Sequence, residues 1–237
     1  MTIDERLDKL KAAVKAAKNE AVTAVMFHET WKPTAYDNDL FKRMGSSSAT
    51  NSFLIIRSSL RREMLLALMR LWDSNQQAIS MRKIRDELRN DEVFNALVSE
   101  RGADDERLAS AISDDLNRVL NVEREKIISL IEIYLKGGKG HATFLKTRTL
   151  RNEHLAHRQI TPSEVPLEDT TDKDIELFYE DTVEIVRLLL SLVLGLGSNL
   201  SEFAKIYSHC AKVFWINARG ERTEGHPNFH PPVPVVD

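Results

Sequence analysis

Residues 50–73 read TNSFLIIRSSLRREMLLALMRLWD, without a glycine or a proline in the whole stretch. Apolar residues recur in it at three- and four-residue steps, which is the period of an α-helix. Other apolar side chains fill the remaining faces, so we expect this helix to be central to the fold. The positions of the regular stripe are Phe53, Ile56, Leu60, Met64, Ala67, Leu68 and Leu71.

The same helical period recurs in most of the chain, and no segment alternates with a period of two. The chain has nine glycines and seven prolines in 237 residues, and four of the prolines lie beyond residue 226. Long stretches therefore lack helix breakers, and the sequence predicts an all-α protein, an elongated helical bundle. We predict helices at 2–26, 50–73, 80–89, 92–99, 106–135, 141–158, 172–194 and 198–215. Residues 28–48 are predicted to form a connection, 1–216 one domain, and 217–237 an extended proline-rich tail.

The overall charge is slightly acidic, −3 at pH 7, which argues against a protein that coats nucleic acid broadly. Residues 136–158 differ, because they hold six lysines and arginines against Glu153 alone. A basic patch of this kind suits a phosphate-binding cleft, and it also suits an ordinary solvated surface.

Two further features of the sequence bear on disulfide bonding and on the cellular location of the protein. Cys210 is the only cysteine, which excludes a disulfide within the chain. The first residues lack the apolar segment of a signal peptide, and the most apolar run, 188–196, is too short to cross a bilayer. We therefore expect a cytoplasmic protein without a membrane partner.

Most of the chemically useful side chains gather at residues 150–158, LRNEHLAHR. Arg151 carries a fixed positive charge, His157 can move a proton near neutral pH, and Asn152 can both donate and accept hydrogen bonds. Together they could hold a phosphodiester and run acid–base chemistry on it. The alternative is a solvated helix end, where basic side chains suit the helix dipole.

The order of Arg151, Asn152 and His157, with five residues between the arginine and the histidine, resembles the signature of HEPN domains (higher eukaryotes and prokaryotes nucleotide-binding). Residues 70–73, Arg-Leu-Trp-Asp, resemble a segment of the HEPN proteins grouped with abortive-infection system U. The resemblance extends over residues 1–215 and implies a helical bundle of the HEPN type with extra helices.

A second pair in the same stretch, Arg148 and His154, has the same spacing. The pair of Arg151 and His157 is preferred because an asparagine follows Arg151, whereas Thr149 follows Arg148. His154 could be a second proton carrier, or it could pair with a neighbouring carboxylate. The residues predicted to contact RNA around the catalytic group are Lys146, Arg148, His154 and Arg158.

The resemblance implies a metal-independent endoribonuclease that uses no cofactor. The ribose 2′-OH would attack the adjacent phosphate. His157 would move the proton, Arg151 would stabilise the transition state, and Asn152 would orient His157 or the phosphate. On one continuous helix Arg151 and His157 would lie about 9 Å apart along the axis and about 120° apart around it. HEPN ribonucleases place two motif helices across a shared cleft, so a homodimer is expected.

Three other hypotheses stay open. The chain could be a non-catalytic HEPN module that binds a nucleotide, RNA or a partner protein, or a helical protein whose apolar faces serve only dimerisation. His154 and His157 have the spacing of two metal ligands on a helix, although metal sites usually add a third ligand. The expected partners are RNA, a second copy of the chain and, from the resemblance to toxin–antitoxin systems, an antitoxin protein.

Overall fold

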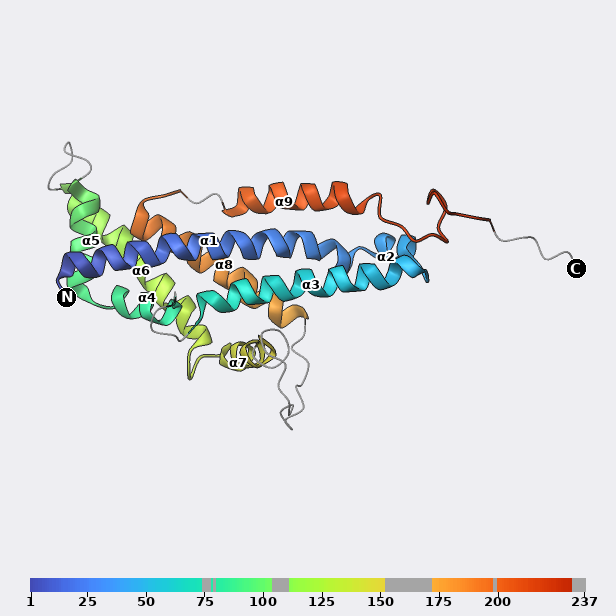
Figure 1. The fold of residues 1–237 in the computed structure, drawn as a ribbon. Helices are drawn as coiled ribbons and strands as arrows, with labels where there is room; N and C mark the ends of the chain where they lie inside the picture. Colours follow the sequence, from blue (N-terminus) through green and yellow to red (C-terminus); the bar gives the residue numbers. More distant parts are fainter. Residues whose placement is uncertain (74–77, 79, 104–110, 152–171, 198–199, 232–237) are drawn as a thin grey trace, which may run out of the picture. The chain divides into compact units, whose positions relative to one another are not determined.

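The computed structural model describes residues 1–73, 78, 80–103, 111–151, 172–197 and 200–231. Within them it contains nine α-helices and no β-strand, which confirms the all-α prediction (Figure 1). The helices are α1 (Ile3–Tyr36), α2 (Asn38–Met44), α3 (Ser48–Leu71), α4 (Met81–Leu88), α5 (Asp91–Ala103), α6 (Ala111–Tyr134), α7 (His141–Leu150), α8 (Asp172–Leu194) and α9 (Leu200–Trp215).

The first compact unit comprises residues 1–24 and 65–200. Helix α6 is its centre, because it packs against α4, α5, α7 and α8. The last part of α3, from Leu65 onward, belongs to this unit, and its side chains Leu65, Leu68 and Leu71 are buried. The stretch that predicted a central helix therefore does supply core side chains.

The second compact unit comprises residues 25–64 and 201–237. Its core contains Leu40 and Met44 of α2, Phe53 of α3, and Ala211 and Trp215 of α9. Phe53 lies edge-on to Trp215, with ring centroids 5.8 Å apart, a favourable arrangement for two aromatic rings. Helix α9 is thus fixed to α2 and α3 by its buried face.

Helix α1 is longer than the sequence predicted. We expected it to end near Met26, with Pro33 in a connection, but it continues to Tyr36 with Pro33 inside it. Proline costs a helix one backbone hydrogen bond. Here Trp31 and Thr34 are fully buried, and the Thr34 hydroxyl donates to the Trp31 carbonyl. Burial of this segment outweighs the intrinsic preference of proline.

Residues 217–231 follow α9 as a series of turns that bond to α2 and α3. The Gly220 amide and the Thr223 hydroxyl both donate to the Arg43 carbonyl, at 2.9 and 2.7 Å. The Glu221 carboxylate accepts from the Ser48 and Ala49 amides at the start of α3. These amide bonds hold the pKa of Glu221 down at about 2.

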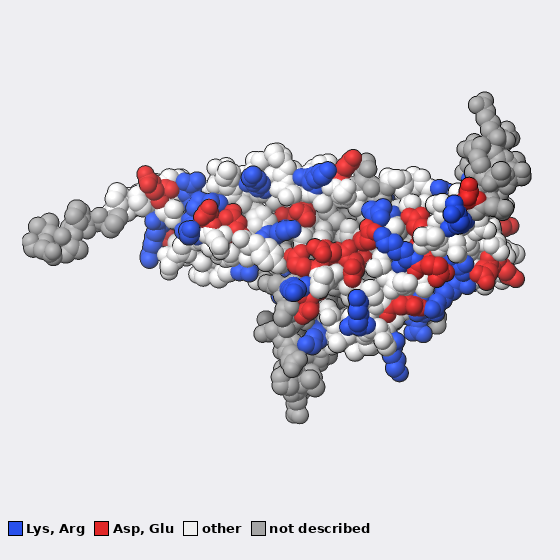
Figure 2. Space-filling view, turned by 180° about the vertical axis from the view of Figure 1, so that it is seen from behind, with Lys and Arg blue, Asp and Glu red and all other residues white. Residues whose placement is uncertain are grey.

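Basic and acidic side chains are interspersed on the face shown in Figure 2. This pattern agrees with the small net charge and with numerous ion pairs between neighbouring side chains. Among the described residues, no helix is both long enough and apolar enough to cross a membrane.

Candidate functional site

The segment that carries the predicted catalytic arginine begins at a tight glycine turn between α6 and α7. A side chain on Gly138 would place its Cβ 2.1 Å from the Glu132 carbonyl oxygen, so only glycine fits there. A Cβ on Gly140 would lie 2.8 Å from the ring of Tyr134. The run Lys136–Gly140 therefore lets α7 fold back closely against the end of α6.

Helix α7 is anchored through Phe144 in a cluster of four aromatic rings. Trp72 is at its centre, with ring centroids 5.4 Å from Tyr134, 5.8 Å from Phe144 and 5.7 Å from Phe178. Three of these side chains come from α6, α7 and α8, while Trp72 follows directly after α3. The cluster ties the two sequence motifs to the same core.

Two polar bonds, one buried and one partly buried, fix the orientation of this cluster. The Trp72 indole N–H donates to the hydroxyl of buried Thr182 at 3.1 Å. The Tyr134 hydroxyl donates to Asp181 Oδ2 at 2.6 Å, and burial together with this carboxylate raises the pKa of Tyr134 far above its ordinary value. Tyr134 is therefore a neutral hydrogen-bond donor and not a proton carrier at physiological pH.

Arg151, directly after α7, forms an ion pair with Asp73. Arg151 Nη1 lies 3.6 Å from Asp73 Oδ2, and about a quarter of each side chain is exposed. The buried Nε of Arg151 has no hydrogen-bond partner among the described residues. The carboxylate contacts the guanidinium at Nη1, and a guanidinium carries further N–H groups that can bind another acceptor.

Asp73 was not predicted as a site residue. In the sequence it is the last residue of the Arg-Leu-Trp-Asp segment, and nothing in its spacing from Arg151 indicates a contact. The neighbouring arginine of that segment, Arg70, bonds to Glu20 at 2.8 Å instead. Of the two charged residues in the motif, Asp73 is the one that reaches the predicted catalytic arginine.

Lys146 and Arg148, predicted to contact RNA, both lie on α7. The Arg148 side chain is exposed and its guanidinium carbon lies 5.9 Å from the centre of the Phe144 ring. Lys146 is partly buried. The other predicted residues, Asn152, His154, His157 and Arg158, lie outside the described residues, as does the predicted continuation of the helix to residue 158.

In the described part of the chain, no group of three or more histidine, cysteine, aspartate or glutamate side chains is placed to hold a metal ion. The pair His154 and His157, the alternative metal site, lies outside that part. The described part of the candidate site consists of Arg151, its carboxylate partner Asp73 and the aromatic cluster beneath them.

The chain matches a known protein family. The model of the family AbiU2, a group of HEPN domains, matches residues 7–214. This range contains both motifs, the whole of the first compact unit from residue 7, and all but the end of α9. Neither a curated protein nor a solved structure matches the chain significantly.

Proposed function

Because the chain belongs to the AbiU2 family of HEPN domains, we propose that it is an abortive-infection effector that cleaves RNA without a metal ion. The observation that carries the proposal is the ion pair of Asp73 and Arg151, which joins the two motif segments. A HEPN signature arginine that is held by a side chain of the second motif is suited to a defined task at a phosphate.

The proposed reaction is an internal transesterification. The ribose 2′-oxygen bonds to phosphorus, the P–O5′ bond breaks, and the products end in a 2′,3′-cyclic phosphate and a 5′-hydroxyl. His157 accepts the proton of the 2′-OH, and the departing 5′-oxygen takes up a proton from solvent or a protonated histidine. Arg151 stabilises the negative charge that grows on the equatorial oxygens, and Asn152 orients His157 or the phosphate.

We further propose that the active form is a homodimer. Two copies of the motif would bring an arginine of one copy and a histidine of the other into the same cleft. Lys146, Arg148, His154 and Arg158 would contact the RNA backbone on either side of the cut. An antitoxin protein that covers this basic cleft would inhibit the enzyme.

One observation favours a second function, a non-catalytic binding module. Asp73 already neutralises much of the charge of Arg151, and an ion pair of this kind can be purely structural. In that case the basic end of α7 would bind RNA or a partner protein without cutting it. Cleavage and binding must therefore be measured separately.

The test incubates the purified protein with single-stranded RNA and transfer RNA in EDTA, beside Arg151→Ala and His157→Ala. Arg118→Ala is the matched control, because Arg118 is exposed and pairs with Asp115 of its own helix. Cleavage by the wild type and the control, with cyclic phosphate ends, supports the enzyme. RNA binding without cleavage by any of the four proteins supports the binding module, and equal cleavage by all four identifies a contaminant.

A further inference from the structure

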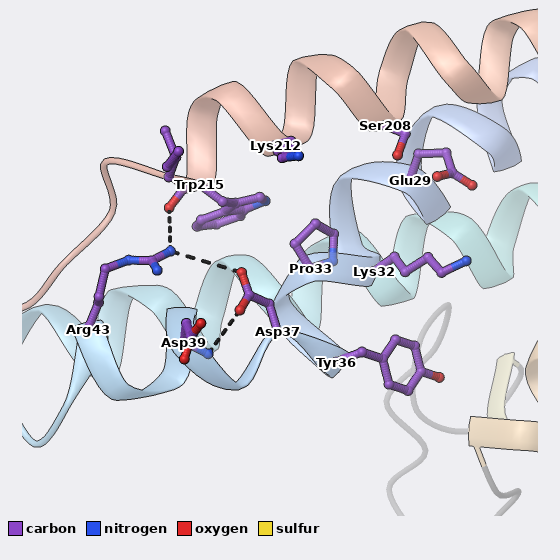
Figure 3. A pocket seen from close by; sticks show the side chains of 11 residues that line it. Glu29, Lys32, Pro33, Tyr36, Asp37, Asp39, Arg43, Ser208, Lys212 and Trp215 are labelled. Atoms are coloured by element: carbon purple, nitrogen blue, oxygen red, sulfur yellow. Dashed lines mark hydrogen bonds and ion pairs between the residues drawn. The ribbon is translucent and has the colours of Figure 1, made fainter.

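A pocket of about 520 Å³ lies in the second compact unit, between α1, α2 and α9 (Figure 3). Its volume is in the range of roughly 300–1,000 Å³ that is typical of small-molecule sites. Neither sequence motif contributes to it. The lining side chains are Glu29, Lys32, Pro33, Tyr36, Asp37, Asp39, Arg43, Ser208, Lys212, Trp215 and Ile216.

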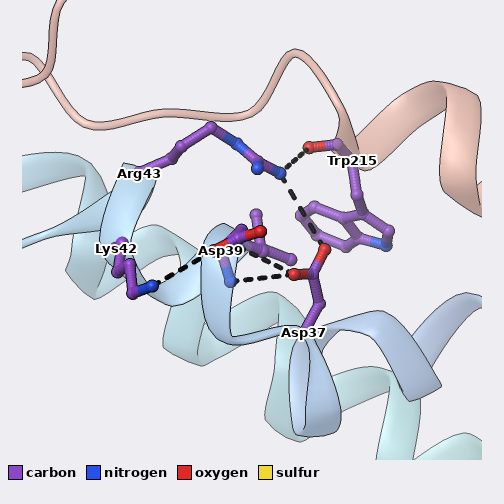
Figure 4. Close-up of polar contacts among 6 residues, drawn as sticks. Asp37, Asp39, Lys42, Arg43 and Trp215 are labelled. Carbon is purple, nitrogen blue, oxygen red and sulfur yellow. Dashed lines mark hydrogen bonds and ion pairs between the residues drawn. The ribbon is translucent and has the colours of Figure 1, made fainter.

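The frame of this pocket is held by polar bonds between its walls (Figure 4). Arg43 of α2 donates to the Trp215 carbonyl of α9 at 3.2 Å, and its guanidinium lies 4.0 Å from Asp37. The Trp215 indole N–H donates to the Thr30 carbonyl of α1 at 2.9 Å. The three helices are thus tied together around the pocket, and a ligand would enter a preformed site.

Each acidic side chain of the pocket already has a partner. Asp37 Oδ1 caps α2 by accepting from two backbone amides, at 2.9 and 3.1 Å. Asp39 lies 3.3 Å from the ammonium group of Lys42, and Glu29 lies 2.9 Å from the ring of the buried His28. These contacts engage each carboxylate without using the remaining basic side chains of the pocket.

Lys32 of α1 and Lys212 of α9 are the basic side chains that remain. Neither makes a hydrogen bond or an ion pair within the described part of the chain, and both are exposed. The pocket therefore presents two available ammonium groups among carboxylates that are already engaged. An anionic ligand is the complement of such a site.

The remaining wall offers flat apolar surface. Pro33 of α1 faces Lys212 and Trp215 of α9 (Figure 3). Tyr36 packs edge-on to Trp31, with ring centroids 5.7 Å apart, and is still 48% exposed. A planar group could stack on these rings while its anionic end meets the lysines.

We propose that this pocket binds a nucleoside phosphate, with the phosphate at Lys32 and Lys212 and the base against Pro33 and Tyr36. The two lysines match the negative charge of the phosphate, and the apolar wall beside them matches the flat base. The same chemistry is presented by a free nucleotide and by one nucleotide of a single-stranded RNA. The site differs from the cleft proposed for cleavage, because none of its lining residues belongs to either motif.

A second pocket adjoins the first one and could accommodate further nucleotides of a bound RNA strand. It is lined by Ala204, Lys205 and His209 in addition to Glu29, Ser208 and Lys212, which line both pockets. Lys205, His209 and Lys212 follow one another at four- and three-residue steps and so lie along one face of α9. An RNA strand seated in the pocket could place its adjacent phosphates along this row.

The experiment measures binding of each of the four ribonucleoside 5′-monophosphates, and of a short 2′-O-methyl oligoribonucleotide that cannot be cut by 2′-OH attack. Calorimetric titrations compare the full-length wild type with Lys32→Ala and Lys212→Ala. We expect each change to weaken binding about tenfold or more, and added salt to weaken wild-type binding. Lys9→Ala is the matched control, because Lys9 is an exposed lysine of α1, as Lys32 is, and does not line the pocket.

Tyr36 tests the base contact separately. Tyr36→Phe should keep most of the affinity, because the ring stays, whereas Tyr36→Ala should weaken binding by about tenfold. Thermal unfolding of each variant shows whether the unit is still folded. If Lys32→Ala and Lys212→Ala fold and bind as the wild type does, the proposal is overturned.

The binding experiment distinguishes a free nucleotide from a nucleotide of single-stranded RNA. Monophosphates that bind and are not displaced by the oligonucleotide indicate a free nucleotide, whereas an oligonucleotide that binds with the same lysine dependence indicates RNA. Binding of an acidic aromatic peptide, without any nucleoside phosphate, overturns the proposal. Binding to His157→Ala should equal that of the wild type, so a failure of the cleavage proposal leaves this one standing.

Discussion

Asp73 and Arg151 meet at the surface of the first compact unit, with 3.6 Å between Oδ2 and Nη1, although one follows α3 and the other follows α7. Below them, Trp72 and Phe144, each close in sequence to one partner, are in ring contact at 5.8 Å. The ion pair therefore rests on a packed base. Its geometry is defined by two elements whose relative position the aromatic cluster fixes.

The first prediction concerns Asp73 as a positioning residue for Arg151. Asp73→Ala should change the free energy of unfolding by less than about 1 kcal/mol, because the pair is partly exposed. It should lower kcat for RNA cleavage by about tenfold, or about 1.4 kcal/mol, with little change in KM, because Arg151 acts in the transition state. Single-turnover kinetics and urea unfolding measure the two effects.

A conservative substitution at Asp73 distinguishes a role in positioning Arg151 from a general effect of losing a negative charge. Asp73→Glu should recover part of the lost rate, because a carboxylate can still reach the guanidinium. Arg70→Ala, the control, removes the ion pair of Arg70 with Glu20 and should leave kcat within about twofold of the wild type. Equal rates for the wild type and Asp73→Ala would show that the pair has no part in catalysis.

The sequence predicted the all-α class and most helices because period and breaker content are local properties. It placed the end of the first helix wrongly, since burial of Trp31 and Thr34 keeps the chain helical through Pro33. It identified Arg151 from a motif, but the partner Asp73 depends on a tertiary contact that no spacing rule encodes. The cationic pair Lys32 and Lys212 was missed for the same reason, because α1 and α9 are distant in sequence.

The second prediction tests the bond between Trp72 and Thr182. Thr182→Val keeps the volume of the side chain but leaves the buried indole N–H of Trp72 without its acceptor. Such an orphaned donor should lower the free energy of unfolding by about 1–3 kcal/mol. Thr147→Val is the matched control, since Thr147 is equally buried and its hydroxyl donates only to a carbonyl of its own helix. Urea unfolding should show a clearly smaller loss for the control.

The third prediction concerns the dependence of stability on pH at Glu184. A hydrogen bond from Arg187, followed by one from Lys126, lowers the pKa of Glu184 to about 2 from an ordinary value of 4.5. A lowered folded-state pKa stabilises the protein above the unfolded pKa, and this contribution is lost as the pH falls from about 4.5 to 2. The side chains are a third to a half exposed, so the contribution should stay below about 1 kcal/mol.

The variant Glu184→Gln tests this prediction, because glutamine has no carboxyl group that can take up a proton. The wild type should be more stable than the variant at pH 7, by an amount that is constant down to about pH 4.5 and then shrinks towards pH 2. Glu180→Gln is the matched control, because it removes one exposed negative charge from the same helix. A difference between wild type and Glu184→Gln that grows on acidification would contradict the assigned contacts.

The fourth prediction concerns the glycine turn that directs α7 to the site. In Gly138→Ala the new Cβ would overlap the Glu132 carbonyl oxygen, at 2.1 Å, so the turn must open and α7 must shift. We expect a loss of about 1–3 kcal/mol in the free energy of unfolding and a fall in RNA cleavage larger than that of Asp73→Ala, because Phe144 and Arg151 move together. Gly197→Ala is the control, since a Cβ there meets no described atom within 4 Å. If Gly138→Ala is as stable and as active as this control, the position of α7 does not depend on the close turn, and the anchoring of Arg151 must come from the aromatic cluster alone.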